Sequence, residues 1–191
     1  MDRREALKNT ALMIGMVSAS SVLGVMSGCK AGKTRDWVPV VLTEGKADLV
    51  ADIAERIIPK SDTPGAKDVG VDAFIDMLLN GYMEKEEVQA FLTGLGQVDS
   101  VAKSLHGDNF SSLKPEEQDA VLTALAKEAD KLEGEERNMA FFPKMKELTI
   151  SGYFTSELVA EKHLNYQPIP GDFIGCVDIS TLEKGNVAWA E

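Results

Sequence analysis

The sequence contains few of the residues that build disulfide, metal and cofactor sites. Its 191 residues include two cysteines and two histidines, and aromatic side chains make up 6% of the chain. Two cysteines exclude a small fold stapled by several disulfides. Neither His106 nor His163 has a second histidine or a cysteine at metal-ligand spacing, so we expect no zinc site.

Motifs that bind nucleotides or activate a nucleophile are also missing. The one G-x-G, Gly94-Leu95-Gly96, lies inside a helical apolar stripe and lacks the third glycine of a dinucleotide loop. There is no P-loop, no C-x-x-C and no G-x-S-x-G elbow. We therefore expect no catalytic residue and no cofactor in this chain. A small hydrolase or cation-dependent enzyme that uses Asp62, Asp72 or Glu157 is an alternative that the sequence leaves open.

Positive charge is scarce. Lys and Arg number 20 against 31 Asp and Glu, which gives a formal net charge of −11. Nucleic acid and anionic membrane surfaces need clustered cations, so neither is expected as the main partner. The acidic residues of the 62–76 region match no EF-hand loop, and we interpret them as helix caps and a solvated helix face.

Long apolar runs are absent as well. The most apolar stretch, residues 10–26, is interrupted by glycine and serine, and a membrane span needs about 20 strongly apolar residues. A charged start, an apolar middle and small residues at the exit predict a secretory signal over residues 1–28. Arg3-Arg4 followed by Leu7-Lys8 resembles the twin-arginine signal, although Ala6 stands where phenylalanine is usual.

Met26-Ser27-Gly28-Cys29 resembles a lipobox, so Cys29 is expected to be lipidated. A multiply acylated cysteine holds a protein at a bilayer, since each buried methylene contributes about 0.8 kcal/mol. We therefore expect an exported, periplasmic protein anchored to a membrane of the cell envelope. Cys176 is then the remaining thiol, and it could form an intermolecular bond, stay free or be buried.

Beyond the signal, the pattern predicts an all-α fold: a compact bundle of five or six helices. Residues 29–43 form a tether and an extended arm, residues 44–164 the helical domain, and residues 165–191 an irregular tail rich in Pro, Gly and aromatics. Apolar periodicity and stop signals place helices at 44–58, 71–82, 85–105, 115–132, 139–148 and 156–164.

Several local features refine this prediction. In the second helix, Asp72 and Asp76 are placed on the face opposite the apolar stripe. Close helix contact or a kink would account for Gly94 and Gly96 inside a helix. Pro64-Gly65 predicts a turn in which glycine adopts a positive φ. A second turn is expected within residues 152–157, with Thr155 or Ser156 capping the last helix.

The body resembles the gluconate 2-dehydrogenase subunit 3 family. The likeness begins with Ile58-Pro59-Lys60-Ser61-Asp62-Thr63-Pro64-Gly65-Ala66 and continues through the F-x-x-G-L of residues 91–95. It ends with the blocks at 152–157, 164–166 and 170–176. The order and spacing of these blocks over residues 46–177 carry the resemblance.

This resemblance implies a non-catalytic small subunit that pairs with a large FAD-binding flavoprotein of the glucose-methanol-choline type, often beside a cytochrome c. FAD and the oxidation of a sugar, sugar acid or glycoside would belong to the large subunit, which the small subunit carries across the membrane and stabilises. Cys176 matches a position that is disulfide-bonded to the large subunit in some relatives. The alternative is a stand-alone envelope lipoprotein that binds a ligand or another surface protein.

Two segments are expected to meet the large subunit. One is the turn after the first helix; the other is the aromatic C-terminal stretch, which is irregular and buries poorly alone. The expected interface residues are Asp62, Thr63, Pro64, Gly65, Tyr153, Phe154, Tyr166, Phe173 and Cys176.

Overall fold

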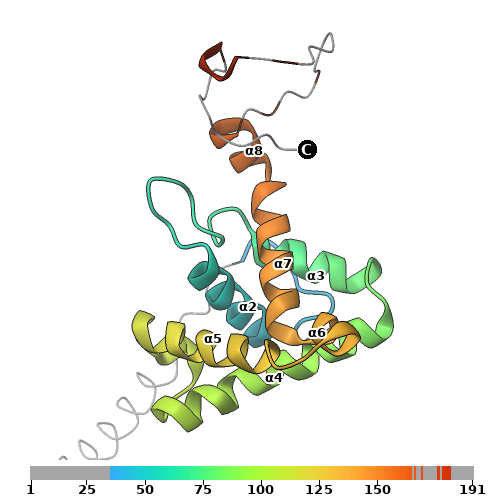
Figure 1. Ribbon diagram of the computed structural model, residues 1–191, viewed down its shortest axis with the longest axis vertical. Coiled ribbons are helices and arrows are strands. Elements are labelled where there is room, and N and C mark those ends of the chain that lie inside the picture. Colours follow the sequence, from blue (N-terminus) through green and yellow to red (C-terminus); the bar gives the residue numbers. More distant parts are fainter. Residues whose placement is uncertain (1–34, 165, 167–168, 170–175, 177, 182–191) are drawn as a thin grey trace, which may run out of the picture. The chain divides into compact units, whose positions relative to one another are not determined.

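The computed structural model describes residues 35–164, 166, 169, 176 and 178–181 (Figure 1). The chain divides into two compact units, Met1–Asp36 and Trp37–Glu191, and the helices described below lie in the second. The predicted all-α fold is confirmed, because the described residues contain helices and no strand. No helix among them is both long enough and apolar enough to cross a bilayer.

Each of the six expected helices is present in the described part of the chain, and one short helix, α6, is added. Helix α6 buries no side chain, so its sequence has no apolar stripe from which the helix could be predicted. The α-helices are α2 (Glu44–Ile57), α3 (Val71–Gly81), α4 (Lys85–His106), α5 (Pro115–Ala129), α6 (Gly134–Met139), α7 (Phe141–Phe154) and α8 (Glu157–His163). Two 3₁₀ turns, η1 (Phe110–Ser112) and η2 (Ile179–Thr181), complete the set.

Helix α7 is the central helix of the bundle. It packs against α2, α3, α4, α5, α6 and α8 (Figure 1). The turn expected within residues 152–157 lies at Thr155 and Ser156, because α7 continues to Phe154, six residues beyond the predicted end at Leu148. Gly152 is buried within this helix, where an added Cβ would lie 2.6 Å from Cδ1 of Phe74. The glycine therefore permits close approach of α3 instead of ending the helix. Ser156, as expected, caps α8 and accepts a hydrogen bond from the Val159 amide.

A buried carboxylate fixes the segment before α2. Asp76 of α3 is 2% exposed, and its oxygens accept hydrogen bonds from the backbone N–H groups of Val40, Val41 and Leu42 at 2.7, 3.0 and 2.7 Å. The prediction of a solvated Asp72–Asp76 face is therefore wrong, since Asp72 is buried too. Three donors on one carboxylate replace the water that Asp76 would otherwise bind.

The two glycines inside α4 have different surroundings. An added Cβ at Gly94 would overlap the Cβ and Cγ atoms of Phe141, so this glycine allows α4 and α7 to meet closely. At Gly96 an added Cβ would find no atom within 4 Å. The expectation of close helix contact is thus confirmed for Gly94, and packing does not explain Gly96.

We predict that Asp76→Ala lowers the free energy of unfolding by about 2–4 kcal/mol, because three amides lose a charged acceptor. Urea denaturation measures the loss, and hydrogen exchange should show faster exchange at the amides of residues 40–42. Asp62→Ala, on an exposed side chain, is the control and should change stability by less than about 0.5 kcal/mol. Equal effects of the two substitutions would contradict the role assigned to Asp76.

We also predict opposite effects for alanine at the two α4 glycines. Gly94→Ala should destabilise the fold by about 1 kcal/mol or more, since the Cβ of Phe141 cannot rotate away from the new methyl group. Gly96→Ala should stabilise it by about 0.5–1 kcal/mol through helix propensity alone. Thermal unfolding of the two variants provides the comparison, and a stabilised Gly94→Ala protein would disprove the close contact.

Candidate functional site

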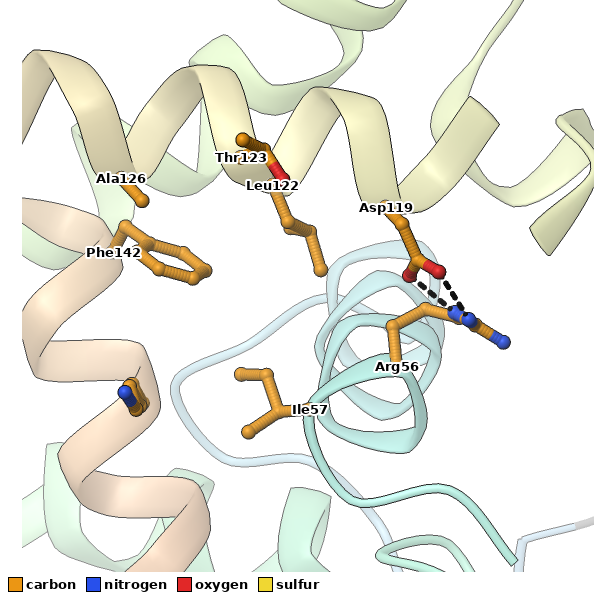
Figure 2. A pocket seen from close by; sticks show the side chains of 8 residues that line it. Arg56, Ile57, Asp119, Leu122, Thr123, Ala126 and Phe142 are labelled. Atoms are coloured by element: carbon orange, nitrogen blue, oxygen red, sulfur yellow. Dashed lines mark hydrogen bonds and ion pairs between the residues drawn. The ribbon is translucent and has the colours of Figure 1, made fainter. Parts of the chain in front are cut away.

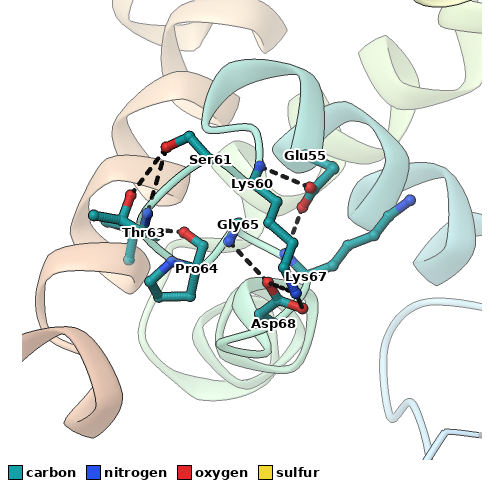
Figure 3. Close-up of polar contacts among 9 residues, drawn as sticks. Glu55, Lys60, Ser61, Thr63, Pro64, Gly65, Lys67 and Asp68 are labelled. Carbon is teal, nitrogen blue, oxygen red and sulfur yellow. Dashed lines mark hydrogen bonds and ion pairs between the residues drawn. The ribbon is translucent and has the colours of Figure 1, made fainter. Parts of the chain in front are cut away.

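The loop between α2 and α3 carries the first block of the family resemblance, and a side chain of α2 holds it in place. The Glu55 carboxylate accepts hydrogen bonds from the backbone amides of Lys60 at 3.1 Å and Lys67 at 3.0 Å (Figure 3). One carboxylate thus joins both ends of the loop to the helix that precedes it. Asp62 and Thr63 lie between these ends and are exposed.

Asp68 makes a second set of bonds within the same loop. Its Oδ2 atom accepts a hydrogen bond from the Gly65 amide at 3.0 Å and lies 3.0 Å from Nζ of Lys60 (Figure 3). The hydrogen bond from the Gly65 amide, and then the Lys60 ammonium, lower the pKa of Asp68 below its ordinary value of 3.8. The loop amides are therefore held by Glu55 and Asp68, neither of which the sequence pattern singled out for that role.

Gly65 has a role other than the one expected. The described glycines with positive φ are Gly70, Gly107 and Gly134, so the prediction of a positive φ at Gly65 is wrong. An added Cβ at Gly65 would instead collide with the carboxylate of Glu55. A glycine here leaves the Glu55 carboxylate free to bind the loop amides, because a larger residue would push that carboxylate aside.

The end of α7 joins this loop. The hydroxyl of Tyr153 donates a hydrogen bond to the carbonyl oxygen of Pro64 at 2.9 Å. The Tyr153 ring meets that of Phe154 edge to face, with centroids 5.3 Å apart. The structure therefore brings Pro64 next to Tyr153, which lies 89 positions later in the sequence, and Phe154 follows Tyr153 directly.

Tyr153 and Phe154 differ in how much of each side chain is exposed to solvent. Tyr153 is 5% exposed, so its ring packs inside this chain and lies beneath the surface where a partner contact was expected. Phe154 is 44% exposed, and Ile150 lies one turn earlier on α7 and is also exposed. Among the described residues, four of the nine exposed large apolar side chains fall between positions 150 and 169: Ile150, Phe154, Tyr166 and Ile169. Ile150 and Phe154, one helical turn apart on α7, form a small exposed apolar patch.

The remaining expected site residues are divided between described and undescribed parts of the chain. Cys176 is exposed, and its thiol is free in the part of the chain that the structure describes. The export-signal residues Arg3, Arg4, Leu7 and Lys8, the lipidation candidate Cys29, and Phe173 lie outside the described residues. In the part of the chain that the structure describes, no group of three or more His, Cys, Asp or Glu side chains is placed to hold a metal ion.

Comparison with known proteins identifies the relatives of this chain. The family model described as Gluconate 2-dehydrogenase subunit 3 matches residues 44–171. The match begins at the first residue of α2 and includes the loop, α7 and α8. No curated protein and no solved structure is significantly similar to the chain.

We predict that Asp68 titrates below pH 3.8 in the folded protein. Because its folded pKa is lowered, its contribution to the loop is complete above the ordinary value and is lost as the pH falls through the lower folded value. Carboxyl-carbon NMR measures this titration. Lys60→Gln should raise the pKa of Asp68, whereas Lys103→Gln, on the exposed end of α4, should leave it unchanged. An Asp68 that titrates at or above 3.8 would rule out the bonds described.

Proposed function

Because the chain belongs to the gluconate 2-dehydrogenase subunit 3 family, we propose that it is the non-catalytic small subunit of a membrane-associated, FAD-dependent dehydrogenase. The large subunit is a flavoprotein of the glucose-methanol-choline type that oxidises a sugar, sugar acid or glycoside. The family match over residues 44–171 is the observation that carries this proposal. The chain binds no cofactor itself, and FAD resides in the large subunit.

The exposed surface supports a binding role. Asp62 and Thr63 at the tip of the loop, and Phe154 at the end of α7, form part of the face that meets the large subunit. Glu55 and Asp68 hold the loop in one conformation before binding. A preformed loop loses less conformational entropy on association, so more of the contact energy appears as affinity.

The N-terminal segment supports an escort role. The pair Arg3-Arg4 directs the folded assembly to twin-arginine export, and the flavoprotein is carried across with it. Cys29 then anchors the assembly on the periplasmic side of an envelope membrane. Cys176, an exposed thiol in an oxidising compartment, is suited to a disulfide with the large subunit.

The escort role is tested by co-expression with the flavoprotein encoded beside this chain. We predict that wild type brings active flavoprotein to the envelope, and that the double variant Arg3→Lys, Arg4→Lys leaves both proteins in the cytoplasm. Cell fractionation with a dye-linked dehydrogenase assay measures the distribution. Arg35→Lys, the same substitution outside the signal, is the matched control and should behave as wild type.

Two outcomes oppose the proposal. If the flavoprotein reaches the envelope in the presence of the double-lysine variant, this chain is no escort. If this chain is exported alone and forms no complex with the flavoprotein, it acts as a stand-alone lipoprotein.

A further inference from the structure

A hollow of about 360 Å³ opens where α2, α5 and α7 meet (Figure 2). Its floor is apolar, with Ile57 from α2 and Leu122 from α5 facing Phe142 from α7 across the space (Figure 2). The polar groups stand around this floor. The lining residues are Arg56, Ile57, Asp119, Leu122, Thr123, Ala126, Phe142 and Lys146.

One wall of the hollow is a neutralised ion pair. Arg56 binds Asp119 in a two-pronged arrangement, with Nε to Oδ1 at 2.9 Å and Nη2 to Oδ2 at 2.6 Å (Figure 2). Each member of this pair is engaged by the other, and the planar fork keeps the wall in place. The pair therefore contributes rigidity to the hollow and no net charge.

Lys146 gives the hollow its charge. This exposed side chain lines the space and has no ion-pair partner within 4 Å among the residues that the structure describes, in contrast to the nearby Lys144. The charged residues that line the hollow thus sum to one positive charge, on a chain whose formal net charge is −11. The ammonium of Lys146 can pair with a carboxylate of a partner.

Helix α7 connects the hollow to the candidate site, since it contributes Phe142 and Lys146 to the hollow and Tyr153 and Phe154 to the site. Phe142, Lys146, Ile150 and Phe154 recur every four residues, so they form a ridge that winds gradually around the helix. The ridge starts in the hollow and ends at the ring that contacts Tyr153, a distance of about 18 Å along the helix axis. Ile150 and Phe154 on this ridge are exposed.

We propose that this α7 ridge, together with the hollow, docks a segment of the flavoprotein large subunit. That segment inserts a large apolar side chain between Leu122 and Phe142 and sets a carboxylate against Lys146. The inference rests on the proposed function and extends its interface beyond the α2–α3 loop and the C-terminal stretch. The family match points to this occupant, because a protein described as subunit 3 of a dehydrogenase assembles with other subunits. The net charge of −11 disfavours a second copy of this chain, since two such copies repel each other.

The two features of the hollow have separate effects on binding. An apolar side chain that fills a pocket carries much of an interface's affinity and slows dissociation. A cation at the rim mainly raises the association rate and makes affinity depend on salt. Filling the hollow and reversing the charge of Lys146 therefore test different parts of the same contact.

The test measures the dissociation constant between this chain and the co-expressed large subunit by surface plasmon resonance at several salt concentrations. We predict that Lys146→Glu weakens binding about tenfold or more, mainly through slower association and with a reduced salt dependence. Thr123→Trp, which fills the hollow from the exposed face of α5, should weaken binding by a similar factor through faster dissociation.

Matched controls separate these effects from net charge and bulk. Lys103→Glu makes the same charge change on the exposed end of α4, and Ser104→Trp adds the same bulk there; both should bind within about twofold of wild type. Circular dichroism melts show whether every variant is folded. A variant that fails to fold is replaced by Lys146→Gln or Thr123→Phe, for which the same directions are expected.

Three results would overturn the inference. Wild-type binding that neither Lys146→Glu nor Thr123→Trp weakens would place the contact elsewhere while leaving the accessory role intact. A complete lack of binding by wild type would remove the proposed function as well. A dimer of this chain in sedimentation velocity, dispersed by Lys146→Glu, would assign the hollow to a second copy instead of the large subunit.

Discussion

Burial of one face of α7 is the constraint on which the rest of the described structure depends. This helix contacts six others, and its inner face is closed by Phe141, Met145, Leu148 and Tyr153. Two glycines allow close packing against this helix: Gly94 lets α4 approach Phe141, and Gly152 lets α3 approach through Phe74. Because packing fixes the inner face of α7, it also fixes the outer face, on which Lys146, Ile150 and Phe154 are exposed.

Three acidic side chains, the buried Asp76, the half-buried Glu55 and the exposed Asp68, hold the backbone in place. Asp76 holds three amides of the arm, while Glu55 and Asp68 hold three amides of the α2–α3 loop. Carboxylates occupied in this way shape the surface and leave the loop with little freedom to adapt. This agrees with a chain that contributes a preformed surface to a dehydrogenase complex.

The sequence predicted the helices well and their contacts less well. Apolar periodicity located α2, α3 and α4 to within about one residue, since each buries a regular stripe. Asp76 was misplaced because it lies at the flank of the α3 stripe, one position from Ile75, and periodicity shows which residues are apolar but not how wide the buried face is. The role of Gly65 could not be predicted either. It depends on the nearby carboxylate of Glu55, ten positions earlier, and only folding brings the two residues together. The end of α7 was also missed, because glycine usually weakens a helix. In the folded protein Gly152 continues the helix and leaves room for the ring of Phe74 from α3.

The attachment of the arm also has a mechanical meaning. Any tension applied to the chain on the N-terminal side of residue 40 enters the helical body at α3, through bonds that converge on one side chain. Such a force is resisted by several bonds at once, and the short turn to Thr43 and α2 lies behind them. A pull on the N-terminal side would thus be spread over the interior of the bundle before it could unwind α2.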